Sequence, residues 1–233
     1  AIKEELGDTR NYGKTLNNLG EVYYDMGDFA EAIEQFNQSI AIKEKLIDKK
    51  GLNSTLFNLG EAQVYNTNYQ DALPNFRRSL SIAMFLDDTF QISERYKGIG
   101  IAHFNLTNFD SAVHYLSKAD SIYADIPINR LTTLSWLAVT FMKDGQKSQA
   151  KSYIKIFNEL IEQHDPNSKD VISLNWNMYQ AHVSVGNKRA AKEYLENAYL
   201  ELKSRSKNIK NKTDRNQYLS VQLHQEISTA WGK

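Results

Sequence analysis

Histidines and carboxylates are the side chains of this sequence that could do acid–base chemistry or bind a metal. No two histidines show the His-Glu-x-x-His spacing, which places two imidazoles and a carboxylate on one face of a helix. The chain has no cysteine, so disulfides, cysteine-based zinc sites and thiol nucleophiles are excluded. No pair of carboxylates is singled out by an apolar setting, and we therefore predict no catalytic constellation, no metal site, no cofactor and no enzyme activity. The five histidines are His103, His114, His164, His182 and His224.

Two segments share features with nucleotide-binding loops. Asp144–Ser148, Asp-Gly-Gln-Lys-Ser, is similar to the end of a phosphate-binding loop but lacks the upstream glycine and the preceding strand of that motif. Gly98-Ile99-Gly100 has the glycine spacing that opens a dinucleotide fingerprint, but it lies inside a predicted helix. We interpret the first segment as a turn between two helices and the second as a packing position within a helix.

A basic stretch, Lys203–Lys212, holds five basic residues and no acidic one. It could hold phosphate, RNA or an anionic surface through salt-sensitive and mostly non-specific contacts. No aromatic residue is interleaved to stack on bases. A solvated helix end is the interpretation we prefer, and we expect no nucleic-acid partner.

The composition favours a folded, helical chain. Of the 233 residues, 41% are hydrophobic and 24% are charged, which argues against intrinsic disorder. Only 3 prolines occur, and their scarcity favours long uninterrupted helices. No run of about 18 apolar residues is present, so we expect no membrane span. We expect a cytoplasmic protein, although the chain starts at Ala1 without Met and a targeting segment could have preceded it.

A repeat of forty residues organises the predicted helices. The same apolar-Gly pair stands at Leu19-Gly20, Leu59-Gly60 and Ile99-Gly100. The same step relates Phe29 to Tyr69 and Phe109, Ala32 to Ala72 and Ala112, and Phe36 to Phe76 and Leu116. Two weaker copies keep the internal offsets, with anchors at Ala138 and Tyr179. Because one such unit buries its apolar face only against its neighbours, the sequence predicts a stacked solenoid.

Each copy has the pattern of two amphipathic helices joined by a short turn. In the first copy we expect Asp28 to be the N-cap of the second helix, with Glu31 as its capping-box partner. Gly20 and Ala32 are expected where the two helices cross, because small residues allow their axes to approach. The aromatic sixteen residues after the glycine, Phe36, is expected to fill the space toward the next pair.

These features resemble the tetratricopeptide repeat family over about residues 10–205. The resemblance rests on the Leu-Gly of the first helix and on the opening aromatic, the alanine and the later aromatic of the second. The period exceeds the usual one of about 34 residues. The segments 18–20 and 58–60, both Asn-Leu-Gly, are similar to the longer-period subclass of Leu-Gly-Asn repeat proteins and bacterial multidomain signalling proteins. The resemblance implies an all-α, right-handed superhelical solenoid of antiparallel helix pairs with a C-terminal capping helix.

The register divides the chain into repeats. Residues 1–8 align with 41–48 at a shift of forty, so we expect them to end a preceding repeat helix and the chain to be an excerpt of a longer protein. The five expected repeats are 10–48, 49–88, 89–126, 127–165 and 167–206. A single capping helix is expected over 213–231, with Leu219, Leu223, Ile227 and Trp231 on its apolar face. The tail is also similar to the end of the repeat region in class III nucleotide cyclases.

The resemblance also implies a ligand site, because in this family the first helices of the pairs line the concave face. Asn18 and Asn58 match positions at which the longer-period family uses an amide to bond the backbone of an extended peptide. The match fails at Gly98 and Trp136. The candidate ligand-binding residues are Asn18, Glu21, Tyr24, Asp25, Phe57, Asn58, Glu61, Tyr65, Lys97, Phe104, Trp136 and Asn177.

Three functions remain open from the sequence. The first is a protein–protein interaction scaffold that binds a peptide or partner domain in its concave groove, where the carboxylates of the first half favour a basic ligand. The second is a sensory or autoregulatory region of a larger bacterial signalling enzyme, a nucleotide cyclase or kinase, which would contact a catalytic domain of the same chain. The third is an enzyme in its own right, which the missing catalytic constellation disfavours.

Overall fold

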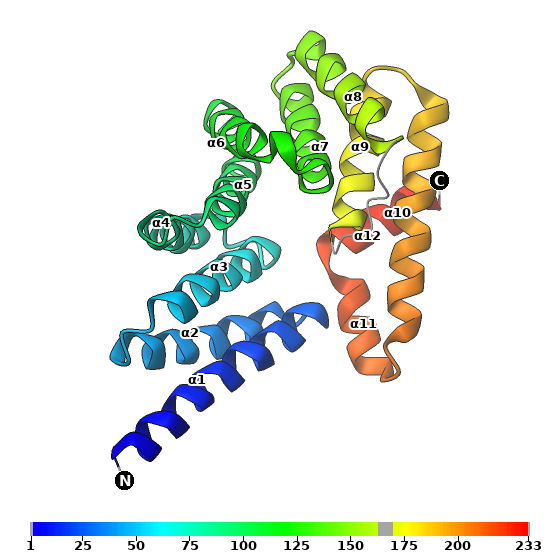
Figure 1. Ribbon diagram of the computed structural model, residues 1–233. Helices are drawn as coiled ribbons and strands as arrows, with labels where there is room; N and C mark the ends of the chain where they lie inside the picture. Colours follow the sequence, from blue (N-terminus) through cyan, green and yellow to red (C-terminus); the bar gives the residue numbers. More distant parts are fainter. Residues whose placement is uncertain (1, 163–169, 233) are drawn as a thin grey trace. The chain divides into compact units, whose positions relative to one another are not determined.

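The computed structural model describes residues 2–162 and 170–232, and within these residues every regular element is a helix (Figure 1). The chain separates into two compact units, Ala1–Leu106 and Thr107–Lys233. Unit 1 contains α1 (Ile2–Asp25), α2 (Phe29–Lys45), α3 (Lys49–Tyr65), α4 (Tyr69–Phe85) and α5 (Thr89–Asn105). Unit 2 contains α6 (Phe109–Ile122), a short 3₁₀ turn (Tyr123–Asp125), α7 (Pro127–Lys143), α8 (Lys147–Ile161), α9 (Val171–Ser184), α10 (Lys188–Asn208), α11 (Lys212–Ser220) and α12 (Gln222–Trp231).

The helices of unit 1 have a constant length and spacing, which explains the period of the sequence. Each of α2 to α5 has 17 residues, and three residues separate each helix from the next. Each helix packs against the one before it in the chain. Equivalent helices therefore start forty residues apart, at Phe29 and Tyr69 for α2 and α4.

One turn geometry produces this spacing. At the end of α2 the amide of Asp48 donates to the carbonyl of Lys43 at 2.9 Å, and the amide of Ile47 donates to that of Glu44 at 3.1 Å. This pair of bonds closes a helix on one residue of left-handed conformation. The Oδ1 atom of Asp48 then accepts the amide of Gly51 at 3.1 Å and caps α3. The left-handed residues are Gly27, Ile47, Thr67, Asp87, Thr107, Gly145 and Gly186.

The turn also decides which capping bonds form. Asp28 is the N-cap of α2, as the sequence predicts, because its Oδ1 accepts the amide of Glu31 at 3.2 Å. The capping-box expectation for Glu31 is wrong. The amide of Asp28 already donates to the carbonyl of Tyr23 at 2.8 Å, so no donor remains for the Glu31 carboxylate, which accepts from Gln35 instead.

Ile47 is one of four non-glycine residues in this left-handed series, with Thr67, Asp87 and Thr107. Its φ is 53°, a conformation that costs an L-residue about 1–2 kcal/mol, and Ile47 is β-branched as well. Since glycine adopts this conformation freely but adds about 0.4–1 kcal/mol of unfolded-state entropy, Ile47→Gly is expected to raise the free energy of unfolding by about 0.5–1 kcal/mol. Urea denaturation measures it. The matched control is Gly27→Ala at the equivalent turn, which should destabilise, and a lower stability of Ile47→Gly would contradict the strain.

Glycine and a buried phenylalanine fix the distance between neighbouring helices of unit 1. A Cβ atom on Gly60 would lie 2.6 Å from the ring of Phe76, and one on Gly98 would lie 2.9 Å from the same ring. The sequence predicts that this aromatic fills the space toward the next pair, and the ring packs against α5 of the next pair and also against α3 of its own. The alanines at the helix crossings, Ala32 and Ala72, are both fully buried.

The start of the chain differs from the expected separate helix over 1–8. From Ile2 the chain runs as one helix, α1, to Asp25 without a break. Gly7 stands forty residues before Ile47, yet it lies within the helix instead of a left-handed turn. Continuing the helix satisfies the backbone groups that a turn would leave to capping bonds.

Unit 2 has its own core between α7, α8 and α9. Residues 163–169 lie between α8 and α9, so the expected boundary between the repeats 127–165 and 167–206 and the histidine at 164 fall outside the described residues. The core is formed by Leu131, Leu134, Ala138, Ile154, Phe157, Leu174, Met178 and Ala181.

The expected single helix over 213–231 is divided into α11 and α12. Val221 is extended between them, with φ −55° and ψ 132°. In a continuous helix Tyr218 and Ile227 would lie about 180° apart around the axis, whereas the break lets both enter one core with Leu202 of α10. The Nδ1 atom of His224 lies 2.6 Å from the carbonyl of Tyr218 and bridges the break.

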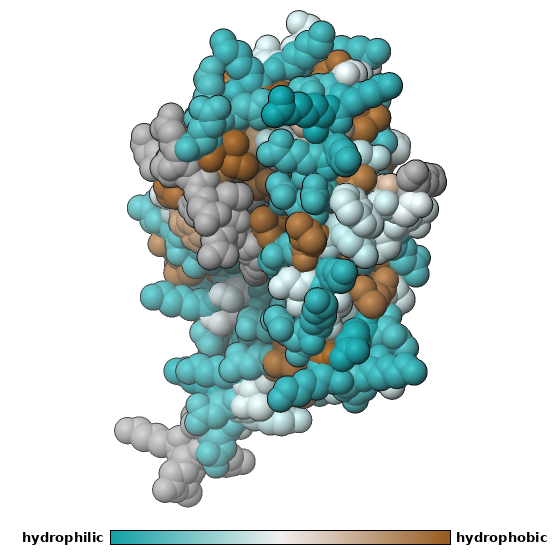
Figure 2. All heavy atoms as spheres, turned by 90° about the vertical axis from the view of Figure 1, so that its right-hand side faces the viewer, coloured by the Kyte–Doolittle hydropathy of each residue, from teal (hydrophilic) through white to brown (hydrophobic). Residues whose placement is uncertain are grey.

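The two last helices cover the end of the α9–α10 pair. Ile227 is fully buried, and Leu219 and Leu223 are half-buried against the same cluster. The ring of Trp231 stacks on Tyr199 at 5.0 Å between centroids. None of the described helices combines the length with the apolar character that a membrane span requires. The face drawn in Figure 2 is mainly hydrophilic, with apolar side chains in small separate patches.

Candidate functional site

Helices α1 and α3 of unit 1 bring together most of the predicted ligand-binding residues. Asn58 of α3 donates through Nδ2 to the Oε1 atom of Glu21 on α1 at 2.8 Å. Glu21 also accepts from Asn17, one turn earlier on α1, at 2.9 Å. The amide nitrogen of Asn58 is therefore occupied by Glu21, whereas the side chains of Asn18 and Glu21 lie exposed.

One turn further along, three aromatic rings meet. Tyr24 and Tyr65 contact edge to face at 5.5 Å between centroids, and Phe29 of α2 stacks on Tyr65 at 5.4 Å. Tyr24 also contacts Phe29 edge to face, at 5.6 Å. All three rings are partly exposed. The sequence pattern groups Tyr24 with Tyr65 but indicates only a packing role for Phe29, so this third ring could not be recognised as part of the site.

Two carboxylates lie near these rings in the sequence of the same helices. Asp25 of α1, next to Tyr24, is exposed, and Glu61 of α3, one turn before Tyr65, is half-buried. We call the resulting patch the α1–α3 surface. It is apolar at the aromatic cluster and acidic around it. It consists of Asn18, Glu21, Tyr24, Asp25, Phe29, Asn58, Glu61 and Tyr65.

Two predicted groove residues lie in the interior instead. Phe57 and Lys97 keep only 8% and 6% of their surface exposed, and Asn17 at the equivalent position keeps 9%. Each stands three residues before Gly60, Gly100 or Gly20, and residues three apart share one helix face. That face packs inside unit 1, so neither the ring of Phe57 nor the ammonium of Lys97 is available as groove surface. Lys97 forms an ion pair with Glu94 at 3.1 Å.

A buried polar network that the sequence did not predict lies beneath the α1–α3 surface. The hydroxyl of Thr55 donates to the Oδ1 atom of Asn17 at 2.7 Å and accepts from the ammonium of Lys43. Burial lowers the pKa of Lys43, and the carboxylates of Asp48 and Glu21 oppose this shift. The network fixes Asn17, which in turn orients Glu21.

A second buried network connects α3, α4 and α5. Arg95 stacks on Phe57 at 4.4 Å from the ring centroid and donates to Ser79 at 2.9 Å and to Gln91 at 2.9 Å. Asn53 completes it, donating to Gln91 and accepting from Ser79, both at 2.6 Å. The sequence carried a signal for this network, because polar residues stand on the apolar face of the predicted helices. Arg95 lies forty residues after Thr55, at the equivalent position of the next repeat.

The remaining predicted residues are spread over other elements. Phe104 of α5 is half-buried. In unit 2, Trp136 of α7 is half-buried, whereas Asn177 of α9 is 2% exposed and donates to the hydroxyl of Ser135 at 3.4 Å. Helix α9 packs against both α7 and α10, which encloses the amide. Asn177 is therefore not part of a surface, contrary to the sequence expectation.

The two segments that are similar to nucleotide-binding loops and three of the histidines occupy structural positions. Asp144–Gln146 forms the turn between α7 and α8, and Gly98 and Gly100 lie inside α5, as the sequence predicts. His103, His182 and His224 are buried, and burial lowers the pKa of each imidazole. No group of three or more metal-binding side chains occurs in the part of the chain that the structure describes.

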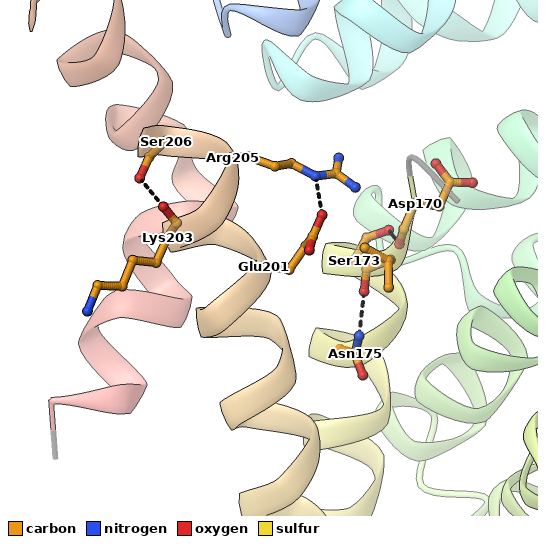
Figure 3. A network of polar contacts seen from close by, with 8 residues as sticks. Asp170, Ser173, Asn175, Glu201, Lys203, Arg205 and Ser206 are labelled. Carbon is orange, nitrogen blue, oxygen red and sulfur yellow. Dashed lines mark hydrogen bonds and ion pairs between the residues drawn. The ribbon is translucent and has the colours of Figure 1, made fainter. Parts of the chain in front are cut away.

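The basic stretch occupies the end of α10 and the turn that follows it. Arg205 donates to Glu201 at 2.7 Å, and the hydroxyl of Ser206 donates to the carbonyl of Lys203 at 3.0 Å (Figure 3). The lysines of the stretch are exposed. Arg215 of α11 donates to the carbonyl of Ile209 at 2.7 and 2.9 Å and so closes the turn.

Comparisons with known proteins agree with this architecture. A tetratricopeptide repeat family model matches residues 1–45. No curated protein matches the sequence. The apo form of RapI superposes with a TM-score of 0.71 at 17% identity, covering 95% of this chain and 85% of that one.

Two further solved structures are similar. A Podosopora anserina protein assigned as a kinesin light chain, with nearly identical TPR-like repeats, gives a TM-score of 0.62 at 18% identity over 82% of this chain and 95% of that one. The Rap conjugation gene regulator of plasmid pLS20, in complex with the Phr* peptide, gives 0.67 at 16% identity over 95% and 64%. The chain therefore has the all-helical fold of tetratricopeptide-like repeat proteins.

Proposed function

We propose that this chain is a protein-interaction scaffold and that the α1–α3 surface binds an extended, basic peptide segment of a partner protein. The observation that carries the proposal is the meeting of Tyr24, Phe29 and Tyr65 beside the carboxylates of Glu21 and Asp25. Partly exposed aromatic rings supply much of the energy at interfaces, and lysine or arginine binds well over such rings. The pLS20 Rap regulator was solved with a bound peptide, which supports a ligand of this class.

The charges of the α1–α3 surface would select the ligand. Glu21 is held by the amides of Asn17 and Asn58, which leave its carboxylate exposed. Charges of this kind mainly set specificity and association rate, whereas aromatic anchors set affinity. Asn18 adds an amide that can donate to and accept from a peptide backbone.

We further propose the division of the chain into five repeats of the longer-period tetratricopeptide type. The forty-residue offset between α2 and α4, and between α3 and α5, supports it. The alternative function, a regulatory region of a nucleotide cyclase or kinase, receives no support from the comparisons.

A selection experiment tests the binding proposal. Panning a phage-displayed library of random linear peptides on the immobilised chain should enrich sequences rich in Lys and Arg. Tyr65→Ala should weaken binding of these peptides by about 1–3 kcal/mol, because it removes one ring of the cluster. Tyr12→Ala is the matched control: Tyr12 is 57% exposed and lies about 18 Å from Tyr24 along α1.

The acidic part of the surface has its own variant. Glu21→Gln keeps an oxygen that can accept from Asn17 and Asn58, so the change should chiefly slow association and reduce its dependence on salt. Enriched peptides that bind Tyr65→Ala and Glu21→Gln as tightly as the unaltered chain would show that the α1–α3 surface is not the site.

A further inference from the structure

A second surface of unit 1 is hollowed and lies away from the aromatic cluster. It is a groove of about 540 Å³ between the C-terminal ends of α2 and α4, with the start of α3 beside them. This volume lies within the range of about 300–1,000 Å³ that ligand-binding pockets have. We call it the α2–α4 groove. It is lined by Glu44, Ile47, Lys49, Leu52, Arg78, Ser81, Ile82 and Phe85.

The groove carries the two most exposed large apolar side chains of the described residues. Ile47 is 79% exposed and Phe85 is 69% exposed, while Leu52 and Ile82 lie buried or half-buried below them. Single exposed apolar residues need no explanation, but two around one hollow with an apolar floor have the character of an interaction site.

The backbone of Ile47 supplies an independent argument. The equivalent turns use Gly27, Thr67, Asp87, Thr107, Gly145 and Gly186, so Ile47 is the one large apolar side chain among the left-handed residues that the structure describes. Ile47 keeps a β-branched side chain in this conformation although four-fifths of that side chain faces solvent, so packing within unit 1 repays little of the strain.

The charges around the groove indicate the chemistry of its occupant. The ammonium of Lys49 lies 3.7 Å from the ring centroid of Phe85, and Arg78 pairs with Glu44 at 2.6 Å while half-exposed. A guanidinium has five N–H donors, so Arg78 can bond a second carboxylate. Lys45 and Lys50 are exposed at the same helix ends, as is the carboxylate of Asp87 in the turn after α4, while the carboxylate of Asp48 caps α3. The lining therefore carries two cations, Lys49 and Arg78, and one carboxylate, Glu44, which is already paired.

We propose that the α2–α4 groove binds an acidic amphipathic helix of a protein partner. Apolar side chains at intervals of three and four residues on that helix contact Ile47 and Phe85 above the floor. Its Asp and Glu side chains pair with Lys49 and Arg78. This site is separate from the α1–α3 surface, which takes a basic segment, so one unit can hold two partners of opposite charge.

The probe for the test is a phage-displayed library of helical peptides in which apolar positions of three-to-four spacing are fixed and the intervening positions vary among Glu, Lys, Gln and Ala. Panning on the chain that carries Tyr65→Ala and Glu21→Gln, which disable the basic-peptide site of the α1–α3 surface, should enrich Glu at the varied positions. Titration of an enriched peptide should show at least a tenfold loss of affinity in Phe85→Ala and in Lys49→Glu. Both residues lie at the surface, so neither change should alter the helical circular dichroism. Ile47→Gly should also weaken binding, although it relieves the strain of the turn.

Controls separate this site from the other surface and from self-association. Tyr65→Ala should bind the enriched peptide as tightly as the unaltered chain. Enrichment of Lys instead of Glu, or equal affinity of the peptide for Phe85→Ala, would overturn the proposal. Sedimentation that shows a dimer of the unaltered chain and a monomer of Phe85→Ala would also overturn it, because the occupant would then be a second copy of the chain.

Discussion

Replacing Ala72 by glutamate is expected to lower the free energy of unfolding of unit 1 by about 3–5 kcal/mol. Ala72 is fully buried in α4, which packs against α3 and α5. A glutamate there adds atoms to a closed crossing and buries a carboxylate, and both effects are among the few that cost this much. Urea denaturation followed by far-UV circular dichroism measures the change.

The matched control for this substitution lies two residues earlier in the same helix. Gln70 is exposed in the first turn of α4, where a carboxylate interacts favourably with the helix dipole. Gln70→Glu should therefore leave stability unchanged or slightly raised. If Ala72→Glu unfolds at the same urea concentration as this control, Ala72 does not lie at a tight helix crossing.

Removing residues 212–233 is expected to make the chain self-associate. The deletion takes away α11 and α12 and uncovers the apolar cluster of α9 and α10, in which Ile172, Ala198 and Leu202 are at most 4% exposed. Terminal repeats without a polar outer face expose such surface to water and become adhesive. Sedimentation over a range of concentrations should show a rising mean mass.

A second truncated chain makes the cause of self-association specific. The same deletion combined with Leu195→Lys and Leu202→Lys places charges on the uncovered cluster and should restore the monomer. If the first truncated chain is already monomeric and as stable as the full chain, then α11 and α12 do not serve as a cap.

The regular part of the fold could be predicted because one turn geometry repeats. The glycines of the first helices and the buried alanines are fixed by contacts that recur at intervals of forty residues, whereas the cap of Asp28 does not recur, since Asn68 and Asn108 make no side-chain cap bond. The break at Val221 could not be read from the sequence. Leu219, Leu223 and Ile227 keep the spacing of a continuous helix, and only the burial of Tyr218 on the same core requires the break.

The candidate site was predictable only in part. The repeat pattern shows which residues share one face of a helix, but it does not show which residues of that face are buried. The family resemblance places Glu21, Tyr24, Asn58 and Tyr65 on one concave face without pairing them, and the structure brings Glu21 into contact with Asn58 and Tyr24 with Tyr65. The resemblance also places Phe57 on the groove. Phe57 is buried because it lies one helical turn before the packing glycine Gly60. How deeply a residue at this position is buried depends on how closely α3 and α4 approach each other.

Binding of a basic peptide at the α1–α3 surface can be mapped residue by residue. Backbone amide chemical shifts of the labelled chain would be followed by nuclear magnetic resonance during titration with a Lys- and Arg-rich peptide from the first selection. We expect the largest changes at 18–25 in α1 and 58–65 in α3, and we expect them to vanish in Tyr65→Ala at the same peptide concentration. Two results together would contradict binding at this surface. The chemical-shift changes would be centred on α2 and α4 or on unit 2, and the Tyr65→Ala chain would bind the peptide with unaltered affinity.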